Sequence, residues 1–62
     1  MKARELIRLL ESKGWRQVRQ SGSHRQYRHP DRPELITVPD HSGVDLKPGT
    51  LNSILKKAGL KP

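Results

Sequence analysis

The sequence predicts a small two-layer α+β domain, in which two helices cover one face of a three-stranded antiparallel sheet. Apolar residues recur at helical spacing near both ends of the chain, over 2–13 and again from Pro48 onward. Three short stretches between them suit strands, and turns containing Gly or Pro separate them. A chain of 62 residues predicts one domain, over 1–62.

The first predicted element is a helix over residues 2–13. Its apolar residues have i, i+3, i+4, i+7 spacing, which places them on one face: Ala3, Leu6, Ile7 and Leu10. Gly14 follows, and glycine readily adopts the left-handed conformation that ends many helices. The apolar Trp15 can then fold back onto the last turn.

The next predicted element is a hairpin. Residues 15–20 suit a strand, whose alternation predicts two sides: Arg16, Val18 and Gln20 on one, and Trp15, Gln17 and Arg19 on the other. A turn at 21–23 (SGS) leads to a second strand at 24–29.

A third strand and a second helix complete the predicted order. Residues 30–33 form a connection, and the β-branched run at 35–38 predicts a strand that Pro39 stops. A polar loop over 40–47 precedes Pro48, which suits the first turn of a helix. The helix has one apolar face and the same Gly-then-apolar ending as the first: Leu51, Ile54, Leu55 and Ala58, then Gly59 and Leu60.

The charge of the chain favours nucleic acid as a partner. Thirteen Lys and Arg against six Asp and Glu give a net charge of +7, and clustered cations displace the counterions condensed on phosphates. The absence of Cys excludes disulfides and thiolate metal sites and permits a reducing cytoplasm. No apolar run approaches the roughly 20 residues of a membrane span. We therefore expect a cytoplasmic location, with no membrane partner.

His24 is the first candidate for chemistry, because it directly follows a turn containing Gly22. Residues three apart in a strand point to opposite faces, so Tyr27 is expected toward the helices and His24 toward the open face. An imidazole there could act as general acid or base at a phosphodiester. The alternative is a solvated histidine in a basic strand.

The other two histidines are weaker candidates. His29 precedes a proline turn, where a structural or surface role is favoured. His41 follows Asp40, a carboxylate that could orient it in a secondary site, although a polar loop that caps the second helix explains the same residues. The three histidines lack the ligand spacing of zinc sites, so no metal or small-molecule cofactor is expected.

The basic residues of the hairpin are the candidates for phosphate contact: Arg16, Arg19, Arg25 and Arg28. Lysines on the second helix are more typical of solubility charges. One Trp and one Tyr, both expected in the core, cannot form a base-stacking platform. Binding should therefore follow the backbone of the nucleic acid and its shape.

Together these motifs resemble the HicA toxins, small mRNA-cleaving toxins of type II toxin–antitoxin systems. The resemblance covers essentially the whole chain and rests on these segments, in order: Gly14-Trp15, Gly22-Ser23-His24, Tyr27-Arg28-His29-Pro30, Thr37-Val38-Pro39, 45–51 and 57–60. It implies a fold similar to the double-stranded-RNA-binding domain, mRNA as substrate, and an antitoxin, HicB, as partner. It also implies that the functional histidine is His24.

The resulting main hypothesis is a metal-independent endoribonuclease with His24 as its catalytic residue. The residues expected to bind RNA around it are Gly22, Ser23, Arg19, Arg25, Arg28 and Lys47. A non-catalytic RNA-binding module explains charge and fold order equally well. A third hypothesis is an interaction protein whose charge is incidental.

Overall fold

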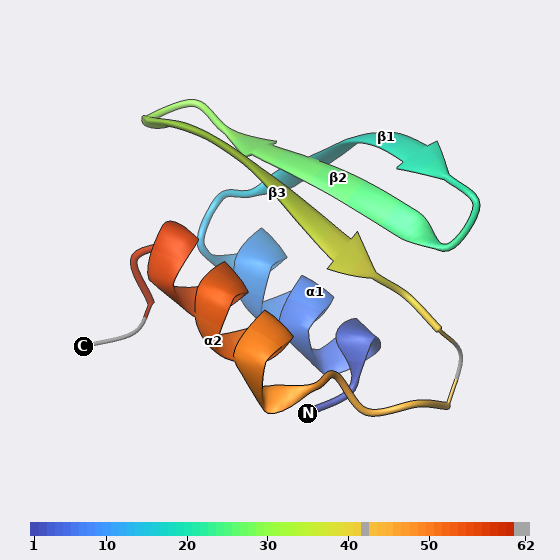
Figure 1. Cartoon of the computed structure of the whole chain (residues 1–62). Helices are drawn as coiled ribbons and strands as arrows, with labels where there is room; N and C mark the ends of the chain where they lie inside the picture. The colour runs from blue at the N-terminus through green and yellow to red at the C-terminus, as the bar shows by residue number, and fades with distance from the viewer. Residues whose placement is uncertain (42, 61–62) are drawn as a thin grey trace.

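The computed structural model describes residues 1–41 and 43–60. Its elements are α1 (Ala3–Ser12), β1 (Arg16–Ser21), β2 (His24–His29), β3 (Arg32–Pro39) and α2 (Pro48–Lys57). The strands form one antiparallel sheet in the order β1-β2-β3, and both helices lie against the same face of it (Figure 1). The predicted α+β fold is confirmed. No helix among the described residues has the length and apolar character needed to cross a membrane.

Both helices end in the Gly-then-apolar arrangement that the sequence predicts. After α1, the N–H of Trp15 donates to the Leu10 carbonyl at 3.1 Å, and the N–H of Gly14 donates to the Glu11 carbonyl at 3.1 Å. This pair of hydrogen bonds satisfies two of the carbonyls that a helix end leaves open. At the end of α2, the N–H of Leu60 donates to the Leu55 carbonyl at 2.9 Å, and the N–H of Gly59 donates to the Lys56 carbonyl at 3.1 Å.

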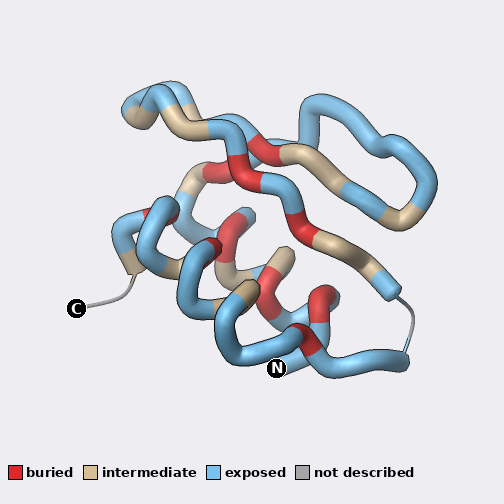
Figure 2. Tube along the Cα trace, viewed as in Figure 1, coloured by how far each residue is buried: buried red, intermediate tan, exposed pale blue. Residues whose placement is uncertain are grey.

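The hydrophobic core fills the space between the sheet and the helices. Buried positions of the two layers face one another in Figure 2. The buried core residues are Ala3, Leu6, Leu10, Trp15, Tyr27, Ile36, Val38, Leu46, Ile54 and Ala58. Tyr27 is only 1% exposed, which confirms that it faces the helices. Burial raises the pKa of its hydroxyl above the ordinary 10.0, partly offset by the charge of Arg25.

The predicted alternation along the first strand is wrong. Gln17 pairs with Tyr27, but the next pair joins Arg19 to Gln26, so Val18 is an extra residue in a β-bulge. Directly paired residues share a face of a sheet. Arg16 and Arg19 therefore lie on the same face, and not on opposite faces as predicted. Every residue of β1 is exposed. Because the strand has no buried face, its sequence shows no apolar alternation from which the register could be predicted.

The third strand is longer than predicted. It spans Arg32–Pro39 in place of 35–38, so the connection after β2 shrinks to Pro30 and Asp31. Pro33, which suggested a break, lies inside the strand. Proline is tolerated there because β3 is an edge strand, where an N–H can be missing without loss of a ladder hydrogen bond.

His29 has a structural role at the far end of β2. Its Nε2 donates to the Lys13 carbonyl at 2.8 Å, and its Nδ1 accepts a hydrogen bond from the N–H of Asp31 at 3.0 Å. Its ring also packs edge-to-face on Trp15, with centroids 5.2 Å apart. His29 thus joins the end of α1 to the β2–β3 turn.

We expect Gly14→Ala to lower the free energy of unfolding by about 1–3 kcal/mol. Gly14 has a φ of 99°, and a Cβ there would lie 2.8 Å from Nε2 of His29. Gly49→Ala is the matched control, because a Cβ at Gly49 meets no atom within 4 Å and lies in the first turn of α2. Urea unfolding should leave the control as stable as the parent or slightly more stable. Equal losses in both variants would contradict this role of Gly14.

Candidate active site

A two-residue turn presents His24 at the start of β2. Ser21 pairs with His24, so the turn consists of Gly22 and Ser23, and Ser21 belongs to β1. Gly22 has a φ of 57°, and Ser23 has no positive φ, which fits the hairpin turn that has glycine at its first position. A Cβ at Gly22 would meet no atom within 4 Å. The backbone conformation, and not packing, therefore favours glycine here.

His24 lies on the face of the sheet opposite the helices. Its side chain is exposed, whereas Tyr27, three residues along β2, is buried against the helices. Alternation along the strand puts Gln26 and Arg28 on the open face with His24. This agrees with the orientation predicted from the sequence.

The bulge at Val18 gathers arginines on this open face. Arg16 pairs with Arg28, and Arg19 pairs with Gln26, so all three arginines share the face of His24. All three are exposed, and within residues 1–41 and 43–60 no carboxylate lies within 4.0 Å of their guanidinium groups. Arg28 is four residues from His24, about 13 Å along the strand.

Arg25 occupies a different environment from the other hairpin arginines. It points to the helix side, where its Nε lies 2.8 Å from Oδ2 of Asp40 and its guanidinium donates to Oε1 of Gln17 at 3.4 Å. The backbone N–H of Asp40 also donates to the Ser23 carbonyl at 2.6 Å. Arg25 is thus part of a contact that joins the hairpin turn to the loop after β3.

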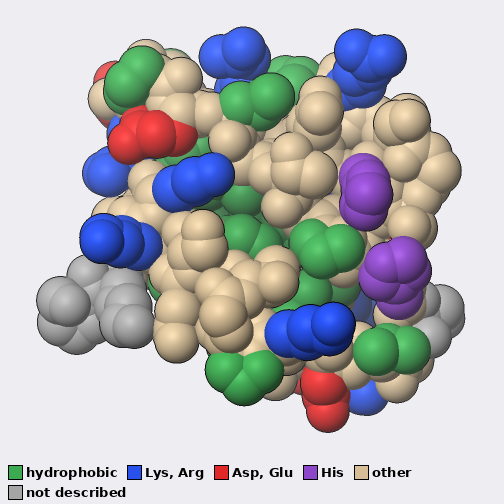
Figure 3. Space-filling model, in the orientation of Figure 1, with side chains coloured by type: hydrophobic (Ala, Val, Ile, Leu, Met, Phe, Trp, Pro, Cys, Tyr) green, Lys and Arg blue, Asp and Glu red, His purple; other side chains and the backbone are tan. Residues whose placement is uncertain are grey.

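His41 lies beside His24, which the sequence pattern did not reveal. Their ring centroids are 6.4 Å apart, with planes at 78°, and two histidine side chains are neighbours on the face shown in Figure 3. The two histidines come together because His24 pairs with Pro39, which lies two residues before His41. That pairing depends on the register of β2 and β3, which the sequence does not specify.

Lys47 borders a hollow that His41 also lines. It is the N-cap residue of α2, and together with His41 and Thr50 it lines a hollow of about 260 Å³. The structure thus brings Lys47 together with His41. Of the residues predicted to bind RNA, the open face of the hairpin holds Arg19 and Arg28, while Arg25 and Lys47 lie elsewhere.

Arginines clustered on one face of a small basic domain are the electrostatic footprint expected for nucleic-acid binding. A family model described as the HicA toxin of bacterial toxin–antitoxin systems matches residues 3–60. The chain therefore belongs to the HicA toxin family, which confirms the resemblance seen in the sequence. It is a toxin of a toxin–antitoxin system, with a cognate antitoxin as partner. No curated protein matches the chain.

We expect the open-face arginines to dominate the salt dependence of binding to single-stranded RNA. Replacing Arg19 or Arg28 by Ala should reduce the slope of log K against log salt by about 0.7 for each phosphate that the toxin no longer neutralises. Lys56→Ala removes the same charge from the last turn of α2 and should leave the slope unchanged. An equal decrease in slope for all three substitutions would show that only the net charge matters, and not the position of the arginines on the open face.

Proposed function

We propose that this toxin is a metal-independent endoribonuclease that cleaves mRNA in the cytoplasm, with His24 as its catalytic residue. One observation carries the proposal: an exposed histidine at a tight glycine turn shares a sheet face with three arginines. Membership of the HicA toxin family supports it. A HicB-like antitoxin is the proposed partner that neutralises the toxin.

The nucleophile in this proposal is the 2′-hydroxyl of the RNA itself, since it is adjacent to the scissile phosphate. His24 removes its proton or protonates the leaving oxygen. Gly22 lets the backbone come close to the phosphate, and Ser23 donates a hydrogen bond. The candidate cations for the developing charge are Arg25, Arg28 and Lys47. Arg28 lies about 13 Å from His24 along β2, Arg25 is paired with Asp40, and Lys47 borders a hollow that His41 lines.

This chemistry predicts the chemical ends of the cut RNA, the effect of EDTA on cleavage, and the outcome with DNA. The cut RNA should carry a 2′,3′-cyclic phosphate or a 3′-phosphate. Cleavage should persist in EDTA, since no metal takes part. DNA should remain intact because it lacks the 2′-hydroxyl.

A non-catalytic RNA-binding module is the alternative, and the arginines of the open face favour it as much as they favour a nuclease. Purified toxin incubated with RNA distinguishes the two. Binding without cleavage, in a preparation free of contaminating nuclease, would support the binding module.

We expect His24→Ala to slow cleavage of a defined RNA by at least about 100-fold, because it removes one proton-transfer group. Val18→Ala is the control, since Val18 is an uncharged, exposed residue of the neighbouring strand. The control should cleave at the parent rate, and circular dichroism should show that both variants are folded. Cleavage by His24→Ala at the parent rate would rule out the catalytic role of His24.

We expect a HicB-like antitoxin to stop cleavage by covering His24 and the open-face arginines. An acidic surface is the natural complement to a domain of net charge +7. Replacing both Arg19 and Arg28 by Ala should weaken the complex, most strongly at low salt, as measured by calorimetry. If saturating antitoxin leaves the cleavage rate unchanged, this mode of neutralisation is wrong.

A further inference from the structure

A single histidine supplies only one of the two proton transfers that the proposed reaction needs. Attack by the 2′-oxygen requires a base that takes the hydroxyl proton, and departure of the 5′-oxygen requires an acid that supplies one. A second titratable group should therefore lie within reach of the same phosphodiester as His24.

His41 meets this requirement by its position. Its ring centroid is 6.4 Å from that of His24, and the planes are nearly perpendicular, at 78°. Both side chains are exposed. A hydrogen bond to a phosphate oxygen spans about 2.8 Å, so two imidazoles at this separation can reach different oxygens of one phosphodiester.

The residue before His41 fixes the loop against the turn that carries His24. The N–H of Asp40 donates to the Ser23 carbonyl at 2.6 Å, and its carboxylate lies 2.8 Å from Nε of Arg25. Because Ser23 and Arg25 are the two chain neighbours of His24, both contacts of Asp40 hold His41 beside it.

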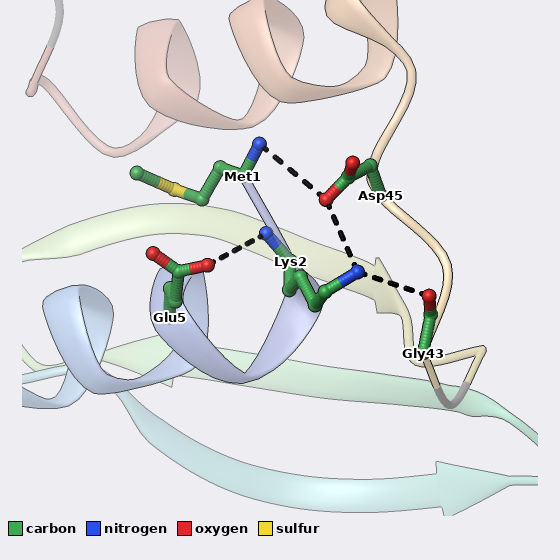
Figure 4. Close-up of polar contacts among 5 residues, drawn as sticks. All are labelled: Met1, Lys2, Glu5, Gly43 and Asp45. Carbon is green, nitrogen blue, oxygen red and sulfur yellow. Dashed lines mark hydrogen bonds and ion pairs between the residues drawn. The ribbon is translucent and has the colours of Figure 1, made fainter.

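Residues 43, 45 and 46 of the loop contact the N-terminus of the chain, and Figure 4 shows the contacts of Gly43 and Asp45. Nζ of Lys2 donates to the Gly43 carbonyl at 2.9 Å and lies 3.5 Å from Oδ1 of Asp45. The N–H of Leu46 donates to the Met1 carbonyl at 2.9 Å. Lys2 is also the N-cap residue of α1. The loop is thus tied at both ends, which preorganises the position of His41.

His41 lines two hollows, each of which holds basic and acidic side chains. It lines a hollow of about 510 Å³ together with Lys2 and Arg4. It also lines the hollow of about 260 Å³ that Lys47 borders. Glu5 and Asp40 share the larger hollow and Asp45 the smaller one, so the attraction for a phosphodiester comes from the excess of cations, Lys2, Arg4 and Arg25, in the larger one.

We infer that His41 is the second proton-transfer group of this toxin and acts as the partner of His24; the inference rests on the proposed function. One imidazole takes the proton of the 2′-hydroxyl as the bond from the 2′-oxygen to phosphorus forms. The other gives its proton to the 5′-oxygen as the bond from phosphorus to that oxygen breaks. The products are a 2′,3′-cyclic phosphate and a 5′-hydroxyl, and exchange with water restores both imidazoles.

Single-turnover cleavage of a defined RNA tests the inference. We expect His41→Ala to slow cleavage by at least about 100-fold. His41→Asn should not restore it, because an amide forms hydrogen bonds but transfers no proton. The pH–rate profile of the parent should be bell-shaped, and His24→Ala and His41→Ala should each lose a different limb. Asn52→Ala, an exposed residue of α2 that lines neither hollow, should match the parent in rate and profile.

A substrate with sulfur in place of the 5′-oxygen separates acid from base, because a thiolate leaves without protonation. This RNA should restore cleavage by the variant that lacks the acid and leave the other variant slow. Restoration of neither variant, or of both equally, would contradict the division of roles between His24 and His41.

The inference and the proposed function fail in different ways. If the parent toxin does not cleave RNA, the proposed function fails and the inference with it. If the parent and His41→Ala cleave at equal rates with the same pH profile while His24→Ala is inactive, only the role of His41 is overturned. Matching circular dichroism spectra and melting temperatures exclude misfolding, which is not expected for an exposed side chain.

Discussion

The contact between Asp40 and the hairpin turn is the constraint on which the candidate active site depends. Its N–H bonds to the Ser23 carbonyl at 2.6 Å and its carboxylate pairs with Arg25 at 2.8 Å, so the end of β3 is joined to the start of β2. Two histidines 17 positions apart in the sequence become neighbours as a result. The half-buried pair of Asp40 and Arg25 thus supports the candidate site, while His24 and His41 themselves are exposed.

The three histidines divide between structure and chemistry according to their surroundings. His29 is held at both ring nitrogens by backbone groups and packs on Trp15, so it serves the fold. His24 and His41 are exposed at the opposite end of β2 and beside the end of β3. One end of the hairpin is therefore held to the core by His29, and the other end presents the two histidines of the proposed site.

Much of the fold could be predicted from the sequence, because apolar spacing and glycine define the helices and their ends. The bounds of β2 followed from the SGS turn and Pro30, and the opposite orientations of Tyr27 and His24 followed from alternation. The bulge at Val18 could not be predicted, since β1 has no buried face to fix its register. The proximity of His41 to His24 was likewise hidden, because it depends on which residues of β2 and β3 pair.

The central claim is that Asp40 holds His24 and His41 side by side at the end of the hairpin where the Gly22-Ser23 turn lies. The most direct measurement is the nuclear Overhauser effect between the ring protons of these two histidines in the free toxin. We expect a cross-peak in the parent protein and a weaker one in Asp40→Ala, which loses the pairing with Arg25. No cross-peak in the parent, or an equally strong one in the folded variant, would contradict the account.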